Sequence, residues 1–152
     1  MERLRVSIDL LETRVGARLF RIALLHVVLE ESDISAEELG RRVDPSDEDL
    51  EILKLFSRNY VAEGENYTDK VVKNELATIV KLMDRIANFE DLFLRVNKVM
   101  GFNPESSKIA FKYVAETVDL LSNVEKQYPK ESKDWEYPLR YQSTRLKDYL
   151  MI

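Results

Sequence analysis

The stretch that decides the fold runs from Ser35 to Ser46 and reads SAEELGRRVDPS. Its first four residues form a capping box, in which the Ser35 hydroxyl can accept a hydrogen bond from the amide of Glu38. In the same motif the Glu38 carboxylate reaches back toward the start of the helix. The pattern therefore predicts a helix over 36–43.

The second half of this stretch ends one helix and starts another. Pro45 restricts the backbone of Asp44 and disfavours a helical conformation there, so the chain must turn. Ser46 can then cap a second short helix, from Asp47 to about Ser57. Two short helices joined by a tight turn are the predicted result.

The residues before this pair follow a helical repeat. Apolar side chains recur in steps of three and four, which is the spacing of one helix face. They are Leu4, Ile8, Leu11, Val15, Leu19, Ile22, Leu25 and Leu29. We predict either one long helix over 2–31 or two helices jointed near Gly16.

After the pair, residues 59–68 combine strand-favouring Tyr60, Val61 and Tyr67 with a polar turn, which favours a short β-hairpin near 60–67. Thr68 can then cap a long helix from Asp69 to about Met100.

Two further helices complete the prediction. Asn103-Pro104-Glu105 is a start signal for a helix that runs to about Gln127, and Pro138 can open a last one. At 152 residues the chain is of single-domain size. We therefore expect one all-α domain over 1–152, a five- or six-helix bundle with the short hairpin as its β-structure.

The span Leu19 to Thr68 resembles a winged helix-turn-helix domain. In that family a first helix precedes a Ser/Thr-capped second helix, a tight turn, a recognition helix and a hairpin. The segment from Ser35 to Val43 matches the second helix, and Gly40 stands where the family keeps a small residue for close helix contact. The resemblance implies a winged-helix-like part over 19–68, followed by a long-helix part over 69–152.

Charge argues against DNA as the ligand of this part. Residues 30–51 hold ten acids against Arg41 and Arg42, a net charge of minus eight. Duplex DNA carries one negative charge per ~1.7 Å, so this surface should repel it. The resemblance therefore implies at most a winged helix that binds protein, and the alternative for this span is a pair of short capped helices, joined by a proline turn, in a plain bundle. The first hypothesis for function is a helical interaction module, and the second is a DNA-binding transcription regulator acting through Arg41, Arg42, Lys54 and Arg58.

Composition excludes several kinds of site. The chain has no cysteine and one histidine, so thiol catalysis and the usual cysteine or histidine zinc sites are ruled out, and we expect no cofactor or metal. The four glycines are isolated, and therefore no Gly-rich phosphate loop is present. With neither a signal-peptide core nor an apolar run of membrane-spanning length, we expect a cytoplasmic protein that does not bind membranes.

A third hypothesis is a helical enzyme that processes RNA or nucleotides. Arg21 and His26 have the Arg-x4-His spacing of helical HEPN-type ribonucleases, but apolar residues surround His26, which favours a buried, hydrogen-bonded histidine. Acids such as Glu37 and Glu38 could hold magnesium only if they converged. We interpret them as solvated capping residues and expect no enzymatic activity.

Two features of the predicted 69–100 helix could bind other molecules. Lys70, Lys73, Lys81, Arg85, Arg95 and Lys98 project within about 140° of one another. This basic stripe is either a solvated face or a surface that binds phosphates or an acidic partner. The candidate binding residues are Lys70, Lys73, Lys81 and Arg85, together with Arg41 and Arg42.

The end of the same helix is apolar nearly all round. Phe89, Phe93, Val96 and Met100 either lie within the fold or make an oligomer contact. The function expected from the whole sequence is a non-catalytic helical interaction or assembly module, such as a small subunit or adaptor of a larger complex, whose partner is another protein or a second copy.

Overall fold

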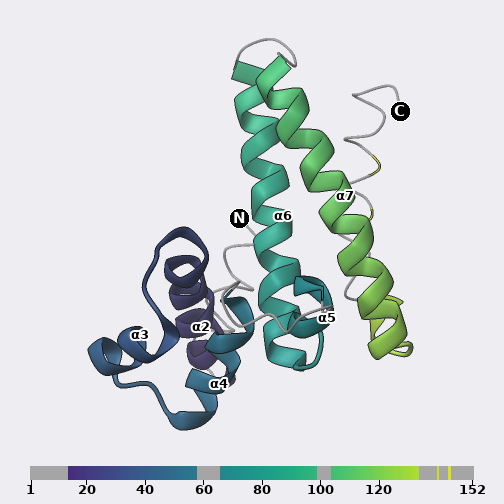
Figure 1. Ribbon diagram of the computed structural model, residues 1–152. Coiled ribbons are helices and arrows are strands. Elements are labelled where there is room, and N and C mark those ends of the chain that lie inside the picture. The colour runs from purple at the N-terminus through teal and green to yellow at the C-terminus, as the bar shows by residue number, and fades with distance from the viewer. Residues whose placement is uncertain (1–13, 58–65, 99–103, 134–139, 141–143, 145–152) are drawn as a thin grey trace. The chain divides into compact units, whose positions relative to one another are not determined.

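The computed structural model describes residues 14–57, 66–98, 104–133, 140 and 144 (Figure 1). Within this part the chain forms helices and no strands, which confirms the all-α prediction. The helices are α2 (Arg14–Glu31), α3 (Ala36–Val43), α4 (Asp47–Phe56), α5 (Tyr67–Val71), α6 (Glu75–Lys98) and α7 (Pro104–Gln127). The chain divides into two compact units, residues 1–80 and 81–152.

The helices around the deciding stretch begin and end where the sequence predicted. Ser35 caps α3 and Ser46 caps α4, each with its hydroxyl accepting from the amide three residues later, at 3.1 and 3.2 Å. Pro104 is the first residue of α7, which ends at Gln127. These helix starts are set by local side-chain chemistry, and local sequence was enough to find them.

The single helix predicted over 69–100 is wrong in its first part. Asn66, not Thr68, is the N-cap of the short α5, and a turn separates α5 from α6. The Asn74 side chain then accepts from the amide of Ala77 at 3.1 Å at the start of α6. Asparagine competes with the helix by bonding nearby backbone groups, and the apolar repeat through this segment concealed the break.

Three expectations fall mainly outside the described residues. Most of the β-hairpin predicted near 60–67 falls within residues 58–65, which the structure does not describe, while Asn66 and Tyr67 are the cap and first residue of a helix. The first part of the predicted 2–31 helix, residues 2–13, also lies outside the described residues. So does the helix from Pro138, apart from Arg140 and Thr144, which are helical.

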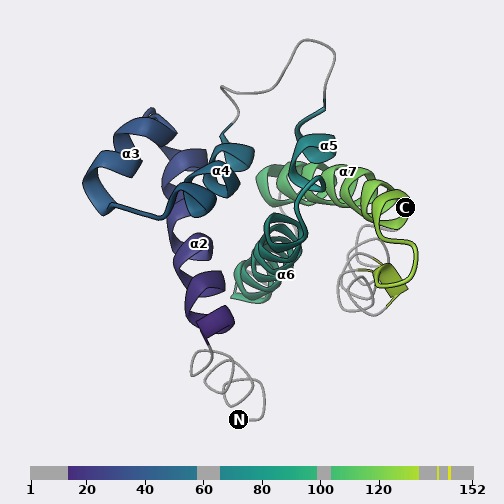
Figure 2. The same cartoon turned by 90° about the horizontal axis from the view of Figure 1, so that it is seen from below.

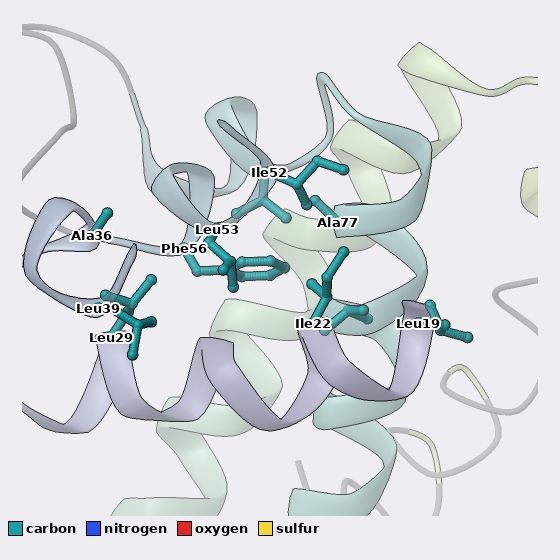
Figure 3. Close-up of a cluster of buried hydrophobic side chains, with 11 residues drawn as sticks. Leu19, Ile22, Leu29, Ala36, Leu39, Ile52, Leu53, Phe56 and Ala77 are labelled. Carbon is teal, nitrogen blue, oxygen red and sulfur yellow. The ribbon is translucent and has the colours of Figure 1, made fainter. Parts of the chain in front are cut away.

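Helix α4 is the centre of unit 1. It contacts α2, α3 and α5, and the three helices α2, α3 and α4 lie together in Figure 2. Phe56 and Leu53 of α4 are fully buried and point toward α2, where Ile22 is also fully buried (Figure 3). The rest of the cluster comprises Leu19, Leu29, Ala36, Leu39, Ile52, Val71, Ala77 and Val80.

Unit 2 is built on α6 and α7, which run side by side (Figures 1 and 2). The Phe89 ring of α6 meets the Tyr113 ring of α7 edge to face at 6.0 Å. Most buried apolar residues of α7 recur in steps of three and four, the spacing of one face: Ala110, Val114, Leu121 and Val124, with the buried Thr117 among them and the buried Leu120 beside Leu121. None of the helices described has an apolar stretch long enough to cross a membrane.

Candidate functional site

The turn between α3 and α4 fixes how these two helices present their side chains. Asp44 adopts the left-handed conformation, with φ 45° and ψ 57°, and its amide donates to the carbonyl of Gly40 at 2.9 Å. A non-glycine residue in this conformation ends the helix as an αL cap. Of the predicted capping box, the Ser35 half is confirmed, whereas the Glu38 carboxylate accepts from Arg42 at 2.5 Å instead of reaching back.

Gly40 allows α3 and α4 to approach closely. A Cβ atom on Gly40 would lie 3.2 Å from Cδ1 of Leu50, which is tighter than an ordinary van der Waals contact. The resemblance to a helix-turn-helix implied a small residue for helix contact at this position, and the contact is present.

Two arginines of α2 hold a buried carboxylate of α4. Arg18 Nε donates to Asp49 Oδ1 at 2.6 Å, Arg21 Nη2 pairs with Asp49 Oδ2, and the Asp49 side chain is only 1% exposed. Arg18 Nη2 also lies 2.8 Å from Glu48 Oε1. These contacts with Glu48 and Asp49 raise the pKa of Arg18.

This ion-pair cluster was missed by the sequence analysis, in which Asp49 was only one of the ten acids counted over residues 30–51. The sequence feature that could have indicated this cluster is the pair Arg18 and Arg21, which lie three residues apart on α2. A shallow open hollow beside the cluster is lined by Ala17, Arg18, Arg21, Ser46, Glu48 and Asp49. Because both arginines already face carboxylates, we interpret the cluster as a tie between α2 and α4.

The outer side of α3, the turn and α4 forms an acidic face. We define it by five exposed residues: Glu37, Asp44, Asp47, Glu48 and Glu51. On α4 every exposed side chain is an acid.

The basic residues near this face are largely engaged. Lys54 is 28% exposed and its Nζ donates to Glu51 Oε1 at 2.6 Å. Arg42 pairs with Glu38, and Arg41 is exposed. Arg58 lies outside the described residues. Residues 36–56 hold seven acids against three bases, a net charge of minus four, so the potential over α3 and α4 is negative.

The predicted basic stripe does not form one exposed surface. Lys70 belongs to α5 and is buried, with its Nζ donating to the carbonyls of Lys54 and Ser57 at 2.7 and 2.8 Å. Lys73 is exposed in the turn before α6. The break between α5 and α6 thus removes both lysines from the helix on which the stripe was drawn.

The two candidates on α6 itself are also buried. Lys81 lies 3.1 Å from Asp84 Oδ2. Arg85 pairs with Glu116 Oε2 at 2.9 Å and lies over the Tyr113 ring, 5.3 Å from its centroid. A helical wheel placed these bases on a polar side, but it could not show that neighbouring side chains would enclose them.

Among the residues named as oligomer contacts, Phe89 and Phe93 are buried. The side chain of Val96 and the whole of Met100 lie outside the described residues. The described half of this set therefore belongs to the interior, and contact through Val96 and Met100 stays a prediction.

His26 is buried and hydrogen-bonded, as its apolar neighbours predicted. Its Nδ1 lies 2.7 Å from the carbonyl oxygen of Ala23, and its ring packs against Phe56 with centroids 4.9 Å apart. Arg21, the other member of the Arg-x4-His pattern, is held by Asp49. Glu30 accepts from the Tyr67 hydroxyl, so it serves to tie α5 to α2.

The comparisons with known proteins add no relative. No protein-family model matches the chain, and neither a curated protein nor a solved structure matches it significantly.

Proposed function

We propose that this protein is a non-catalytic interaction module that binds a basic protein partner through its acidic face. The observation that carries the proposal is the composition of α4, whose exposed side chains Asp47, Glu48 and Glu51 are all acidic. Complementary charge accelerates encounter and excludes partners of the same sign. A partner segment rich in lysine and arginine fits this surface.

The geometry of α3 and α4 supports a fixed docking surface. Both helices are capped at their N-termini, and Asp44 fixes the turn between them. The Asp49 ion pairs hold α4 on α2, so the exposed Asp47 and Glu51 on the other side of α4 keep their relative positions. Such preorganisation lowers the entropic cost of binding.

The proposal includes the absence of catalysis. It is supported by the burial of His26 and by the separate partners of Glu30 and Glu38, which are Tyr67 and Arg42. The test is an assay with nucleoside triphosphates and RNA in the presence of magnesium or manganese. Turnover that disappears in His26→Ala, or in Glu37→Gln with Glu38→Gln, would contradict it.

A DNA-binding regulator is the second candidate. It is favoured by the order α2, α3, α4 and by the close contact of Gly40 with Leu50. It is disfavoured because the helix that would enter the groove exposes acids, and phosphates repel them.

The binding test uses a fluorescein-labelled peptide rich in lysine and arginine, with anisotropy measured across a salt series. We expect binding that weakens as salt rises, since exposed charges are screened. Neutralising the face with Glu37→Gln, Asp47→Asn and Glu51→Gln should weaken binding by about tenfold, the equivalent of ~1.4 kcal/mol.

The matched control neutralises three exposed acids of unit 2, through Glu105→Gln, Glu125→Gln and Glu131→Gln. This control variant changes the net charge by the same amount as the acidic-face variant, but at other positions. We expect it to weaken binding by no more than about twofold, since none of these acids belongs to the acidic face and screening by salt limits the effect of net charge alone. Equal losses in the two triple variants would show that the acidic face is not the binding surface.

A further inference from the structure

Helix α2 carries an apolar stripe on the side that faces away from α4. Phe20, Leu24 and Val27 are 50%, 57% and 45% exposed, and Ala17 is exposed beside them. At ~100° per residue these four positions fall within an arc of about 80°, opposite the buried Ile22. Phenylalanine and leucine left half in water at this spacing mark a contact surface.

The spacing of the stripe is that of a coiled-coil seam. From Ala17 the steps are three, four and three residues, which are the a and d positions of a heptad repeat. The stripe covers about 15 Å of helix at 1.5 Å per residue. A second helix with the same repeat could pack along it.

Between Ala17 and Val27 no charged residue lies within the arc of the stripe, and Glu31, the last residue of α2, continues that arc one turn after Val27. Ala23 and Val28 flank it, and both are partly buried apolar residues. Arg21 is the charged residue at one edge, and its guanidinium pairs with Asp49. In an antiparallel pair centred on the stripe, Glu31 of each copy lies beyond Ala17 of the other, so the two stripes meet no row of like charges, although each chain carries a net charge of minus five.

We propose that two copies of this protein pair through α2, with the stripe of each packed on the stripe of the other about a two-fold axis. A two-fold interface requires a self-complementary surface, and a short seam of uncharged side chains satisfies this requirement. The site is separate from the acidic face and does not depend on the function proposed for that face.

The size of the stripe sets the strength of the dimer. Four small to medium apolar side chains, three of them about half exposed, can bury on the order of 300 to 500 Å² per copy, against ~800 Å² per partner in a standard stable complex. The dimer is accordingly weak, with a dissociation constant of about micromolar or higher, and it depends on protein concentration.

Sedimentation equilibrium over roughly 10 to 500 µM protein tests the dimer. We expect the average mass to rise from the 17.8 kDa of one chain toward twice that value. Leu24→Glu should hold the mass at the monomer value while circular dichroism stays helical, because Leu24 is exposed and its loss leaves no cavity. A constant monomer mass for the natural protein across the series would overturn the proposal.

The control substitutes an equally exposed leucine of the other unit. Leu94→Glu changes a side chain that is 60% exposed on α6 and should leave the dimer unchanged. Exposed apolar residues also occur on α7, where Phe111 and Val118 are about half exposed. A dimer that survives Leu24→Glu but is lost in Leu94→Glu or Phe111→Glu would place the interface in unit 2 and refute pairing through α2.

Crosslinking gives a second readout that does not require a change of charge. The chain has no cysteine, so Leu24→Cys introduces a single thiol near the middle of the stripe. Under mild oxidation we expect disulfide-linked dimer to form about tenfold faster than with Ser122→Cys, an exposed position on α7. Equal rates for the two variants would mean random collision, and the proposal would fail.

Discussion

At the residue scale, the most consequential side chain of unit 1 is Asp49. It is buried, and both of its oxygens face arginines of α2. Substituting Asp49 with asparagine keeps the size of the side chain but removes the charge that two guanidinium groups oppose. Breaking a buried ion pair costs about 3–5 kcal/mol, and the partial exposure of Arg18 and Arg21 lowers this to about 2–3 kcal/mol.

Urea unfolding measures this loss, and Glu48→Gln is its matched control. Glu48 is 74% exposed and precedes Asp49 in the chain, so the same chemical change there should cost less than about 1 kcal/mol. Equal losses in the two variants would show that the position of the acid does not matter. They would contradict the assignment of Asp49 as the tie between α2 and α4.

The pH dependence of the tie follows from Arg18. Its folded-state pKa is raised, so its contribution to stability is complete below the ordinary arginine pKa and is lost only as pH rises through the higher folded value. We expect the difference in unfolding free energy between the natural protein and Asp49→Asn to stay constant from about pH 7 to about pH 10. A difference that shrinks over this range would assign the stabilisation to a group that titrates there.

At the element scale, the sequence predicted the helices whose ends are capped locally and missed what depends on neighbours. Ser35, Ser46 and Pro104 act on backbone groups three residues away or fewer, so their effects could be read along the chain. Burial of Asp49 depends on arginines of another helix. The break before α6 depended on Asn66 and Asn74, whose signals were weaker than the continuous apolar repeat.

The burial of Lys70 against the end of α4 also depends on a neighbouring helix and could not be predicted from local sequence. A lysine drawn on a helical wheel looks like a surface charge, yet this one is buried and donates to the carbonyls of Lys54, in the last turn of α4, and of Ser57, its C-cap. Lys70→Met keeps the aliphatic stem and removes the donor. We expect a loss of about 2–3 kcal/mol, because two carbonyls lose a charged partner.

The control for this substitution is Lys73→Met, an exposed lysine three residues later, which should cost less than about 0.5 kcal/mol. Hydrogen exchange of the last turn of α4 should also become faster in Lys70→Met alone. Unchanged exchange in that turn, with a general loss of stability, would mean that Lys70 acts through packing and not as a cap.

At the scale of the whole molecule, charge is unevenly distributed along the chain. Residues 1–80 hold eleven bases and seventeen acids, net minus six, and residues 81–152 hold twelve and eleven, net plus one, which together give the minus five of the chain. The first unit also contains the part that resembles a helix-turn-helix. Shape and charge therefore make opposite predictions about duplex DNA.

Charge reversal on the acidic face distinguishes between the predictions that shape and charge make about duplex DNA. We expect the natural protein to show no binding of a 25-base-pair duplex at about 150 mM salt, because phosphates repel exposed Asp47 and Glu51. Changing Glu37, Asp47 and Glu51 to lysine should create binding that weakens with salt, with a log–log slope of roughly 0.9 for each phosphate neutralised. The substituted side chains are exposed, so circular dichroism should stay helical.

The outcomes discriminate because each hypothesis assigns the binding to different residues. A natural protein that binds duplex tightly and selectively, and loses binding in Arg41→Glu but not in Lys73→Glu, would establish the regulator and refute binding through acids. A reversed variant that stays helical yet binds no duplex would show that α3 and α4 do not present a groove-binding shape. Binding in the reversed variant alone would mean that the acids, and not the helix arrangement, keep this protein off DNA.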